Sequence, residues 1–499
     1  MSTLGIEFSD AGLQVALAGA NGPELHSVGG QGGSLEWPGF VYHDGKKLRF
    51  GRAAEDVWFV HPRSVSHSFL AKLTHEPSSL TVTGKPPSYS ELAFLFLRDF
   101  TQTLATSAGP LQKLVLAVPG AYLKDPATED EKIGLLLGMA GELGLPLAGI
   151  IDMASASLCD PRAGGFNPSL PVVVLDLHLQ AAELSLLSTD ARLERKKFLH
   201  LPQSGLAQLL KHLTGTMGNR FLRHTAFDIL ADGRIEQTFY RQTKDFLLSE
   251  AAEFRFQVNT ASRTYEMLVK HEQLANDAQA FVGALIQALQ GFAPGSSHGP
   301  EPCTVALTDR AACLPGLEAR LRSAGFSRLL RLPHGAAAAG AASIGEKRLS
   351  VPGDLTDVPV ETSAAAADIC RAVGAPWEAR LQKARLFEPR PMPTHAVIDG
   401  IGHLLGGNGG FTVGAASACA DLALPEAFNT ASDCLVHLIR DGGRLWFVDP
   451  APAPAGSPKT ESTLRTVVEA GDHLAIRCGG NAADLLFVYC EGAATPRPV

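Results

Sequence analysis

Two short apolar runs meet at a polar corner near the middle of the chain, where residues 171–187 read PVVVLDLHLQAAELSLL. The first run, residues 172–175, has the length and β-branched content of a buried strand. The second run covers residues 182–187, and no glycine lies between the two. This pattern predicts two strands joined by a tight turn, with Asp176 at its mouth.

Before this corner, the pattern predicts hairpins followed by strands that alternate with helices. Residues 89–105 carry apolar side chains at Leu92, Phe96, Phe100 and Leu104, which mark one face of a helix. Further strands are predicted over residues 4–8, 14–17, 37–42, 47–50 and 114–118, and further helices from residue 51, over 125–143 and from 152.

After the corner, long helical patterns dominate. Helices are predicted over residues 206–227, 233–251, 271–290, 314–324 and 334–342, and strands over 254–258 and 304–307. Strands that alternate with helices indicate an α/β chain rather than a helical bundle or a sandwich.

The pattern changes again beyond residue 345. Residues 346–394 are rich in proline and charge, which indicates a linker, with one helix predicted over 366–386. Residues 395–499 hold short alternating runs separated by Gly, Asp and Pro turns, which predicts a separate all-β module. The predicted parts are therefore 1–171, 172–345, 346–394 and 395–499.

Composition and charge exclude several classes of protein. A chain of 499 residues with 45% hydrophobic content is long enough for two or three cores. Its net charge of −8 gives no basic field for nucleic acid. The eight cysteines form no CxxC pair, which is typical of reduced thiols in a cytoplasm. No apolar run reaches the length of roughly 18 residues that a membrane span needs, so we expect a cytoplasmic protein without membrane insertion.

Seven landmarks over residues 1–345 occur in an order that resembles the nucleotide-binding domain of DnaK-type heat-shock chaperones (Hsp70-like), a branch of the actin-like ATPase superfamily. They read GIEFSDAGLQVAL, WPGFVYHDGKKLRFGRAA, LVLAVPGAY, AGELGLPLAGIIDMASASL, VVVLDLHLQAAELSLL, VALTDRAACLPGLEARL and HGAAAAGAA. The resemblance implies an actin-like α/β fold of two lobes, residues 1–171 and 172–345, with a nucleotide cleft between them.

The first loop that holds phosphate in that family is altered here. Where the family has D-L-G-T-T, this chain has EFSDA, which includes Glu7, Ser9 and Asp10. Asp10 places a carboxylate where a phosphate oxygen would lie, and two like charges at short range repel each other.

The second phosphate loop and the adenosine loop are altered as well. The family's D-L-G-G-G-T reads DLHLQA, so Asp176 is kept while His178, Leu179 and Gln180 replace three glycines. Side chains at these positions should obstruct the close backbone approach that glycine allows. The family's glycine pair is replaced by residues 309–310, Asp309 and Arg310.

Three charged residues of this chain have the same residue type as the family has in the implied site. Glu7 and Asp176 match the family's magnesium-organising carboxylates, and Lys72 lies near the position of its catalytic lysine. They leave two interpretations open. Either they form a diverged site that binds Mg-ATP, with the metal near Glu7 and Asp176, or the carboxylates are turn residues and Lys72 is a surface lysine.

The last part of the chain, from Phe411 to Tyr489, contains the stretches FTVGAASACADLALP, TASDCLVHLIRDGGRLWFVDP, VEAGDHLAIR and LLFVY. In this order they resemble a forkhead-associated (FHA) domain, the β-sandwich that binds phosphothreonine. Its binding residues differ: Ala415 stands for the family's arginine, and the S-R-x-H motif keeps Ser432 but has Asp433 in place of arginine. A phosphate site needs arginine-type donors, so we expect a vestigial phosphopeptide site. His437, Asp441 and Asp472 are interpreted as strand and turn residues rather than as a catalytic set.

These observations predict a pseudo-ATPase scaffold without a cofactor, which binds protein partners in a bacterial cytoplasm. A first alternative is a chaperone-like ATPase that uses ATP and Mg with Glu7, Lys72 and Asp176. A second alternative is an actin-like assembly protein of a pilus or division apparatus.

Overall fold

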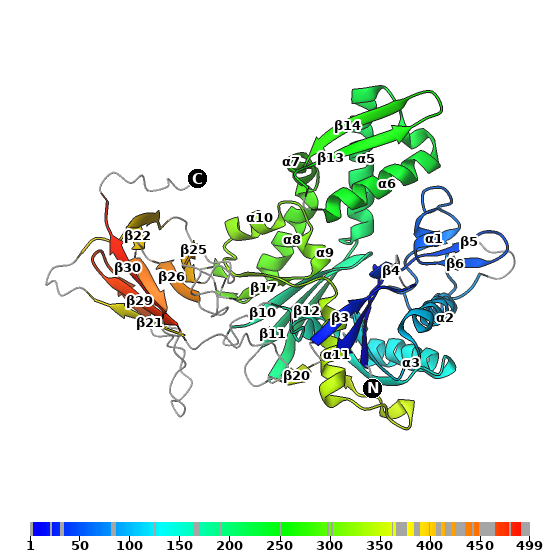
Figure 1. Ribbon diagram of the computed structural model, residues 1–499, viewed down its shortest axis with the longest axis horizontal. Helices are drawn as coiled ribbons and strands as arrows, with labels where there is room; N and C mark the ends of the chain where they lie inside the picture. Colours follow the sequence, from blue (N-terminus) through cyan, green and yellow to red (C-terminus); the bar gives the residue numbers. More distant parts are fainter. Residues whose placement is uncertain are drawn as a thin grey trace. The chain divides into compact units, whose positions relative to one another are not determined.

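The computed structural model describes a large part of the chain. The described ranges are residues 3–19, 22–29, 34–80, 86–123, 126–163, 170–188, 192–249, 251–296, 299–300, 303–361, 363–365, 377–383, 390–398, 400–405, 411–414, 421–424, 435–441, 444–448, 465–478 and 481–490. They form a mixed α/β chain with several sheets, as predicted (Figure 1).

The chain divides into two compact units. The first comprises residues 1–163, 169–320 and 331–370, and the second comprises residues 164–168, 321–330 and 371–499. Within the first unit we call residues 3–163 the first half, and residues 170–320 with 331–348 the second half.

The helices of the described ranges nearly all belong to the first unit. They are α1 (Arg52–Glu55), α2 (Tyr89–Ala108), α3 (Pro126–Glu142), α4 (Met153–Ser157), α5 (Leu206–Thr225), α6 (Gly233–Leu248), α7 (His271–Asp277), α8 (Gln279–Phe292), α9 (Asp309–Ala312), α10 (Leu317–Ser323) and α11 (Ala336–Arg348). Single 3-10 turns cover Gly120–Tyr122 (η1), Ile229–Ala231 (η2) and Leu355–Asp357 (η3). None of the helices in the described ranges has the length and apolar character needed to span a membrane.

The strands up to residue 365 are β1 (Thr3–Phe8), β2 (Gly12–Gly19), β3 (Gly22–His26), β4 (Glu36–Pro38), β5 (Val41–His43), β6 (Leu48–Phe50), β7 (Val65–Ser66), β8 (Lys113–Val118), β9 (Leu147–Asp152), β10 (Val172–Leu177), β11 (Ala181–Ser188), β12 (Arg192–Pro202), β13 (Glu253–Asn259), β14 (Thr264–Lys270), β15 (Gly295–Ser296), β16 (Gly299–Pro300), β17 (Thr304–Leu307), β18 (Leu329–Arg331), β19 (Val360–Glu361) and β20 (Ser363–Ala365).

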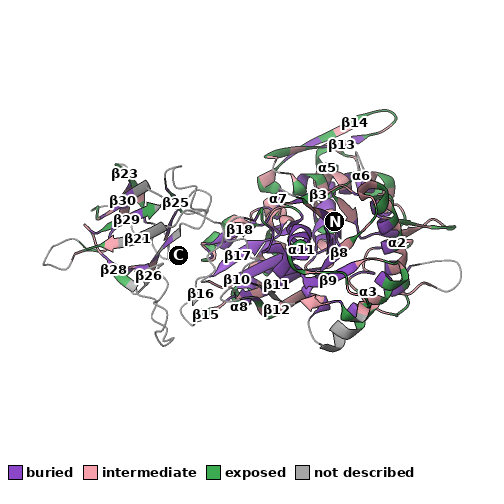
Figure 2. Cartoon of the chain, turned by 60° about the horizontal axis from the view of Figure 1, so that its bottom comes forward, coloured by how far each residue is buried: buried purple, intermediate pink, exposed green. Residues whose placement is uncertain are grey.

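The two halves of the first unit repeat one strand pattern. In the first half, β1 pairs antiparallel with β2 and parallel with β8. In the second half, β10 pairs antiparallel with β11 and parallel with β17. Strands β3 and β12 extend the two patterns beyond β2 and β11. The orders β3-β2-β1-β8 and β12-β11-β10-β17 are therefore equivalent. Both central hairpins are largely buried, which Figure 2 shows for β10 and β11.

Helix α11 joins the two halves through small residues. A Cβ atom on Gly5 of β1 would lie 2.0 Å from the carbonyl oxygen of Ala338, and one on Gly340 would lie 1.8 Å from that of Ala156 in α4. Only glycine permits such close approach of two backbones. The alanine-rich sequence of α11 therefore lets a helix of the second half pack directly against the sheet of the first.

Helices α5 and α6 and the hairpin β13–β14 form a separate layer of the second half (Figure 1). Phe221, Phe239, Phe246 and Phe256 are fully buried within it and stack edge to face or tilted. Its helices were predicted, but strand β14 was not, although every second residue of that strand faces solvent, which is the alternation typical of a half-buried strand.

The second unit contains two five-stranded sheets. Their strands are β21 (Trp377–Gln382), β22 (His395–Ile398), β23 (Ile401–Leu404), β24 (Phe411–Gly414), β25 (Leu422–Ala423), β26 (Leu435–Asp441), β27 (Arg444–Val448), β28 (Arg465–Val468), β29 (His473–Cys478) and β30 (Asn481–Val488). The orders are β21-β29-β30-β22-β23 and β25-β24-β26-β27-β28. Apolar side chains of both sheets share one core, which includes Val413, Leu438, Leu474 and Phe487.

The predicted helix over residues 366–386 is wrong where the structure describes that stretch. Trp377–Gln382 is strand β21, which pairs antiparallel with β29. The sheet partner lies almost 100 residues further along the chain, and its hydrogen bonds decide the local conformation against the helical pattern. The second unit thus begins earlier than the predicted boundary at residue 395.

Candidate functional site

The turn of the β1–β2 hairpin and the corner of the β10–β11 hairpin lie against each other. The carboxylate of Asp10 accepts hydrogen bonds from the backbone N–H of Leu179 at 2.8 Å and of Gln180 at 3.0 Å. Ser9 Oγ lies 3.0 Å from Nδ1 of His178. The two turns that the resemblance assigns to phosphate binding therefore bind each other.

The backbone carbonyl groups of the corner also accept hydrogen bonds from within the protein. The N–H groups of Leu206 and Ala207, at the start of α5, donate to the carbonyls of His178 and Leu179, both at 2.9 Å. A Cβ atom on Gly205 would lie only 2.3 Å from the carbonyl oxygen of Leu179, so glycine is required there. The backbone groups of the corner are thus satisfied internally, as buried polar groups must be.

His178 is the central charge of the corner. Its ring is 4% exposed, and Nε2 lies 3.5 Å from Asp176 and 3.4 Å from Glu183. Burial lowers the pKa of the imidazole, but the carboxylates of Asp176 and Glu183 outweigh it and raise the pKa to about 10. His178 is therefore an imidazolium held among carboxylates.

Glu183 was not among the predicted site residues. It lies on β11 directly opposite Asp176 and accepts hydrogen bonds from the N–H of Gly120 at 2.9 Å and of Ala121 at 3.2 Å. Burial raises the pKa of its carboxyl, yet the charge and hydrogen bond of His178 bring it down to about 2. The sequence signal that could have identified Glu183 is that it is the single acidic residue in the apolar run AAELSLL.

Arg310 pairs with Glu7, one of the two carboxylates near which the alternative prediction places magnesium. It is 5% exposed, and its guanidinium lies 2.7 Å from Glu7 and 2.8 Å from Glu36. Burial raises the pKa of Glu7 to about 7, although the charge of Arg310 opposes this rise. Glu36 was also missed by the sequence reasoning, since it lies on the short strand β4 outside the family landmarks.

The remaining carboxylates near Arg310 are bound by neighbouring side chains. Thr308 Oγ1 donates to Asp176 at 3.0 Å, and His334 pairs with Asp309. Burial raises the pKa of Asp309, but the hydrogen bond from His334 lowers it to about 2. The void between Glu7, Asp176 and Thr308 measures about 10 Å³, which is about the room for one water molecule.

The other predicted residues lie elsewhere. Lys72 is exposed, and its ammonium lies 3.4 Å from the hydroxyl of Tyr89 and over that ring. Gln180 turns outward and its amide contacts His67 Nδ1 at 2.7 Å. Within the described ranges, no three His, Cys, Asp or Glu side chains are arranged to hold a metal ion.

The predicted phosphopeptide residues of the second unit, Ala415, Ser432 and Asp433, lie outside the described residues. Asp472 is buried in the turn before β29 and pairs with Lys383 at 2.6 Å and Arg390 at 2.7 Å. His437 and Asp441 belong to β26. The predicted assignment of Asp472 to a turn is confirmed.

A cavity of about 400 Å³ remains next to the closed corner, between the two halves, and we call it the inter-half cavity. Its lining residues come from both halves: Ala11, Glu36, Phe40, Glu55, Leu179, Leu206, Leu210, Tyr240, Lys244, Leu247, Leu248, Asp309, Arg310, Cys313 and His334.

A seam of polar bonds links the halves beside this cavity. Gln237 accepts from the N–H of Phe59 at 2.9 Å and donates to the carbonyl of Glu55 at 3.0 Å. The Glu55 carboxylate accepts from the hydroxyl of Tyr240 at 3.0 Å and pairs with Lys244. A Cβ atom on Gly233 would lie 2.6 Å from the carbonyl of Phe59. The two halves are therefore joined without a ligand.

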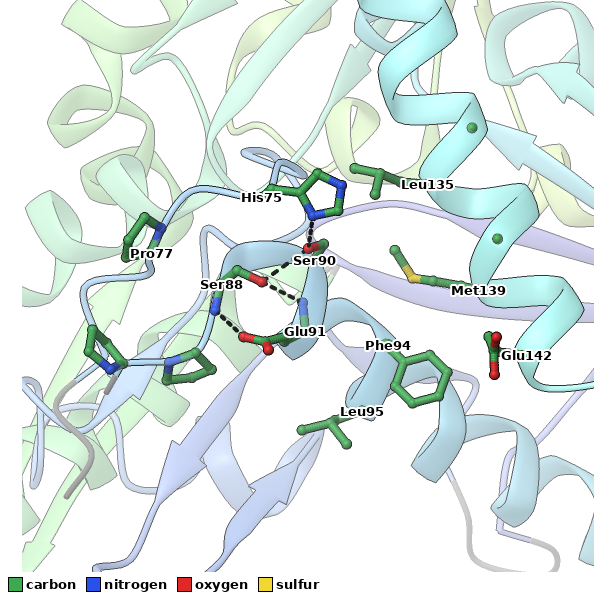
Figure 3. A pocket seen from close by; sticks show the side chains of 14 residues that line it. His75, Pro77, Ser88, Ser90, Glu91, Phe94, Leu95, Leu135, Met139 and Glu142 are labelled. Atoms are coloured by element: carbon green, nitrogen blue, oxygen red, sulfur yellow. Dashed lines mark hydrogen bonds between the residues drawn. The ribbon is translucent and has the colours of Figure 1, made fainter. Parts of the chain in front are cut away.

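A wider hollow of about 940 Å³ lies between the start of α2 and α3 (Figure 3). Its polar groups serve the fold: Ser88 and Glu91 form the capping box of α2, and Ser90 contacts Nδ1 of His75 at 3.3 Å. Phe94, Leu95 and Met139 supply apolar walls. This hollow carries no cluster of charged groups comparable to the corner.

No protein-family model matches the chain, and no curated protein matches it.

Proposed function

We propose that this chain is an actin-like, DnaK-related pseudo-ATPase that acts as a scaffold or adaptor through protein contacts. The observation that carries the proposal is that the carboxylate of Asp10 accepts hydrogen bonds from the backbone N–H groups of Leu179 and Gln180. Successive N–H groups at such a corner form a concavity that binds anions. In this chain the anion is part of the protein.

The repeated strand order supports the actin-like part of the proposal. The equivalent patterns β3-β2-β1-β8 and β12-β11-β10-β17 place the two turns face to face. Two related halves with their first hairpin turns opposed are what the sequence resemblance implies.

Charge opposes nucleotide at the corner. A phosphate that entered would have to displace Asp10 from two N–H groups and then remain close to a displaced carboxylate. Each charge-assisted hydrogen bond contributes about 1.5–3 kcal/mol, and an unpaired buried carboxylate costs more. The protein's own anion therefore competes at an effective concentration that a free nucleotide does not reach.

The residues for hydrolysis are also engaged. Arg310 binds Glu7, Thr308 binds Asp176, and Lys72 is exposed beside Tyr89. A site for Mg²⁺ with several waters needs more room than the void of about 10 Å³ between the carboxylates. Because the binding of phosphate and metal at the corner is disfavoured, we assign the function to the surfaces of the two units. We propose protein partners for them.

Isothermal titration calorimetry with Mg-ATP tests the proposal. We expect no saturable heat with the full-length protein and no release of phosphate. Micromolar binding together with hydrolysis that Asp176→Asn abolishes would favour the ATPase alternative. Asp245→Asn, at an exposed position of α6 in the same unit, is the matched control and should leave either result unchanged.

A further inference from the structure

The inter-half cavity has an apolar wall and a charged wall. The apolar wall comes mainly from the first turn of α5, with Leu206 and Leu210, the end of α6, with Leu247 and Leu248, and Phe40 of the first half. Small-molecule sites usually measure roughly 300–1,000 Å³ and combine a mostly apolar lining with a few polar groups. The volume of about 400 Å³ and the leucine lining therefore match a site for a small molecule.

The charges in and directly behind the charged wall are balanced. Four acids pair with four bases, and the eight residues are Glu7, Glu36, Glu55, Asp309, Arg52, Lys244, Arg310 and His334. An ionic ligand would bring a charge for which this wall holds no unpaired counter-charge, and it would lose hydration on entering. The wall therefore favours an uncharged ligand.

Two polar groups of the charged wall remain accessible. The hydrogen bonds of the Glu36 carboxylate within the described structure all end on Oε2, while 23% of its side chain is exposed. Its Oε1 is not one of the buried atoms that lack a partner, so it is an acceptor open to a ligand. The side chain of Lys244 is 19% exposed, and its ammonium donates to Glu55. An ammonium has three N–H groups, which leaves donors for a ligand.

These two groups come from different halves and line the same cavity. Burial raises the pKa of the Glu36 carboxyl, but the charges of Arg310 and Lys244 outweigh burial and lower it. Lys244 thus lies close enough to act on Glu36 electrostatically, although its ion pair is with Glu55. An acceptor and a donor that face the same space are complementary to an amide group, which offers both an N–H and a C=O.

We propose that the inter-half cavity binds an uncharged small molecule that carries a carboxamide group on a compact apolar body. The amide N–H donates to Glu36 Oε1, the amide carbonyl accepts from Lys244, and the body packs against Leu206 and Leu210. The bound molecule then bridges the two halves beside the closed corner. The proposal is independent of the scaffold proposal, because its ligand carries no phosphate and its test does not involve Mg-ATP.

Isothermal titration of the full-length protein with three naphthalene derivatives of similar shape tests the proposal. The probe 2-naphthamide has both N–H and C=O groups, 2-acetylnaphthalene has a methyl group in place of the NH₂ group, and 2-naphthoate is the anion. We expect saturable, micromolar binding of the amide. The ketone should bind at least tenfold more weakly because Glu36 Oε1 loses its donor, and the anion should also bind at least tenfold more weakly. No saturable binding of the amide, or equal affinity for either analogue, would overturn the proposal.

Two substitutions at exposed leucines locate the probe. Leu248 lies at the cavity and is 45% exposed, whereas Leu268 on β14 is 53% exposed and is not a lining residue. Leu248→Trp should narrow the cavity and weaken binding of 2-naphthamide at least tenfold, while Leu268→Trp should leave it unchanged. Thermal unfolding of both variants shows that each remains folded. Unchanged affinity in Leu248→Trp, or an equal loss in both variants, would refute the site.

Discussion

The space between the two halves has a closed end and an open end, and they differ in how much room the side chains leave. At the closed end, Asp10 accepts from backbone N–H groups of the other half and Arg310 pairs with Glu7 of the other half, while His178 contacts Ser9 across the halves and pairs with Asp176 of its own half. At the open end, the inter-half cavity keeps about 400 Å³. The comparison teaches that the corner, to which the resemblance assigns phosphate binding, can be filled by the protein's own polar side chains while the adjoining cavity stays open.

The closed end is expected to be the more costly to disturb. Its charges are buried, and their partners come from residues far apart in sequence. A buried charge that loses its partner pays the desolvation cost alone, whereas an exposed pair exchanges its partner for water. Five predictions test this difference, and they run from the largest substitution effect to the smallest.

Replacing Arg310 should have the largest effect. Arg310→Ala leaves Glu7 and Glu36 without their shared cation, and we expect a loss of about 3–5 kcal/mol in the free energy of unfolding. Urea unfolding followed by the helical circular-dichroism signal measures it. Arg255→Ala removes the exposed pair with Glu266 and should cost below about 1 kcal/mol. Equal costs for the two variants would contradict the ranking.

Replacing Asp10 should have the next largest effect. Asp10→Ala leaves the N–H groups of Leu179 and Gln180 without acceptors, and we expect a loss of about 2 kcal/mol or more. The same unfolding measurement applies. The control is Asp245→Ala on the exposed face of α6, which should change the free energy of unfolding by less than about 0.5 kcal/mol. A change below that margin for Asp10→Ala would mean that the corner does not need its internal anion.

The pH dependence of stability should carry the signature of His178. Its folded pKa of about 10 lies above the ordinary 6.5, so its contribution is complete below pH 6.5 and is lost as the pH rises towards 10. We expect stability to fall across this window by at most about 1.4 kcal/mol per pH unit for this one group. His178→Gln should flatten the slope.

Glu183 gives the opposite sign at low pH. Its folded pKa of about 2 lies below the ordinary 4.5, so its contribution is present above pH 4.5 and is lost as the pH falls towards 2. Glu183→Gln should reduce the loss of stability in that window. An unchanged acid profile in this variant would argue against the paired state of His178 and Glu183.

Replacing Lys72 should have the smallest effect. Its side chain is exposed beside Tyr89, so Lys72→Ala should change the free energy of unfolding by less than about 0.5 kcal/mol. It should also leave the calorimetric response to Mg-ATP unchanged. If Lys72→Ala abolished a measurable binding of Mg-ATP, Lys72 would belong to the nucleotide site of the ATPase alternative.

Local patterns were sufficient for much of the fold. Helix α2 was predicted because its apolar positions follow the helical period, and the β10–β11 hairpin was predicted because two short apolar runs flank a polar corner. Strand β12, with the sequence RLERKKFLHLP, was missed because its charged side chains obscure the alternation of a partly exposed strand. The predicted helix over 271–290 divides at Ala278 into α7 and α8, since a short turn inside a helical pattern leaves little trace in the sequence.

The site was harder to predict because its bonds are long-range. The comparison with the family's loops identified Asp10, His178 and Arg310 as departures and Asp176 as a retained carboxylate, but it gave no partner for any of them. Asp10 and Leu179 are separated by 169 positions, and Arg310 and Glu7 by 303. Their pairing depends on how the two halves pack, which no local pattern contains. The sequence therefore predicted a carboxylate that repels phosphate, and the structure adds that this carboxylate accepts the backbone N–H groups of Leu179 and Gln180.

Amide hydrogen exchange at Leu179 and Gln180 tests these hydrogen bonds most directly. It can be followed on full-length protein by mass spectrometry of peptides that contain the corner. We predict slow exchange without nucleotide, no further slowing with Mg-ATP, and fast exchange in Asp10→Ala at temperatures where the variant stays folded. Fast exchange in the unmodified protein that Mg-ATP slows would show that the corner awaits a phosphate, and would contradict the account.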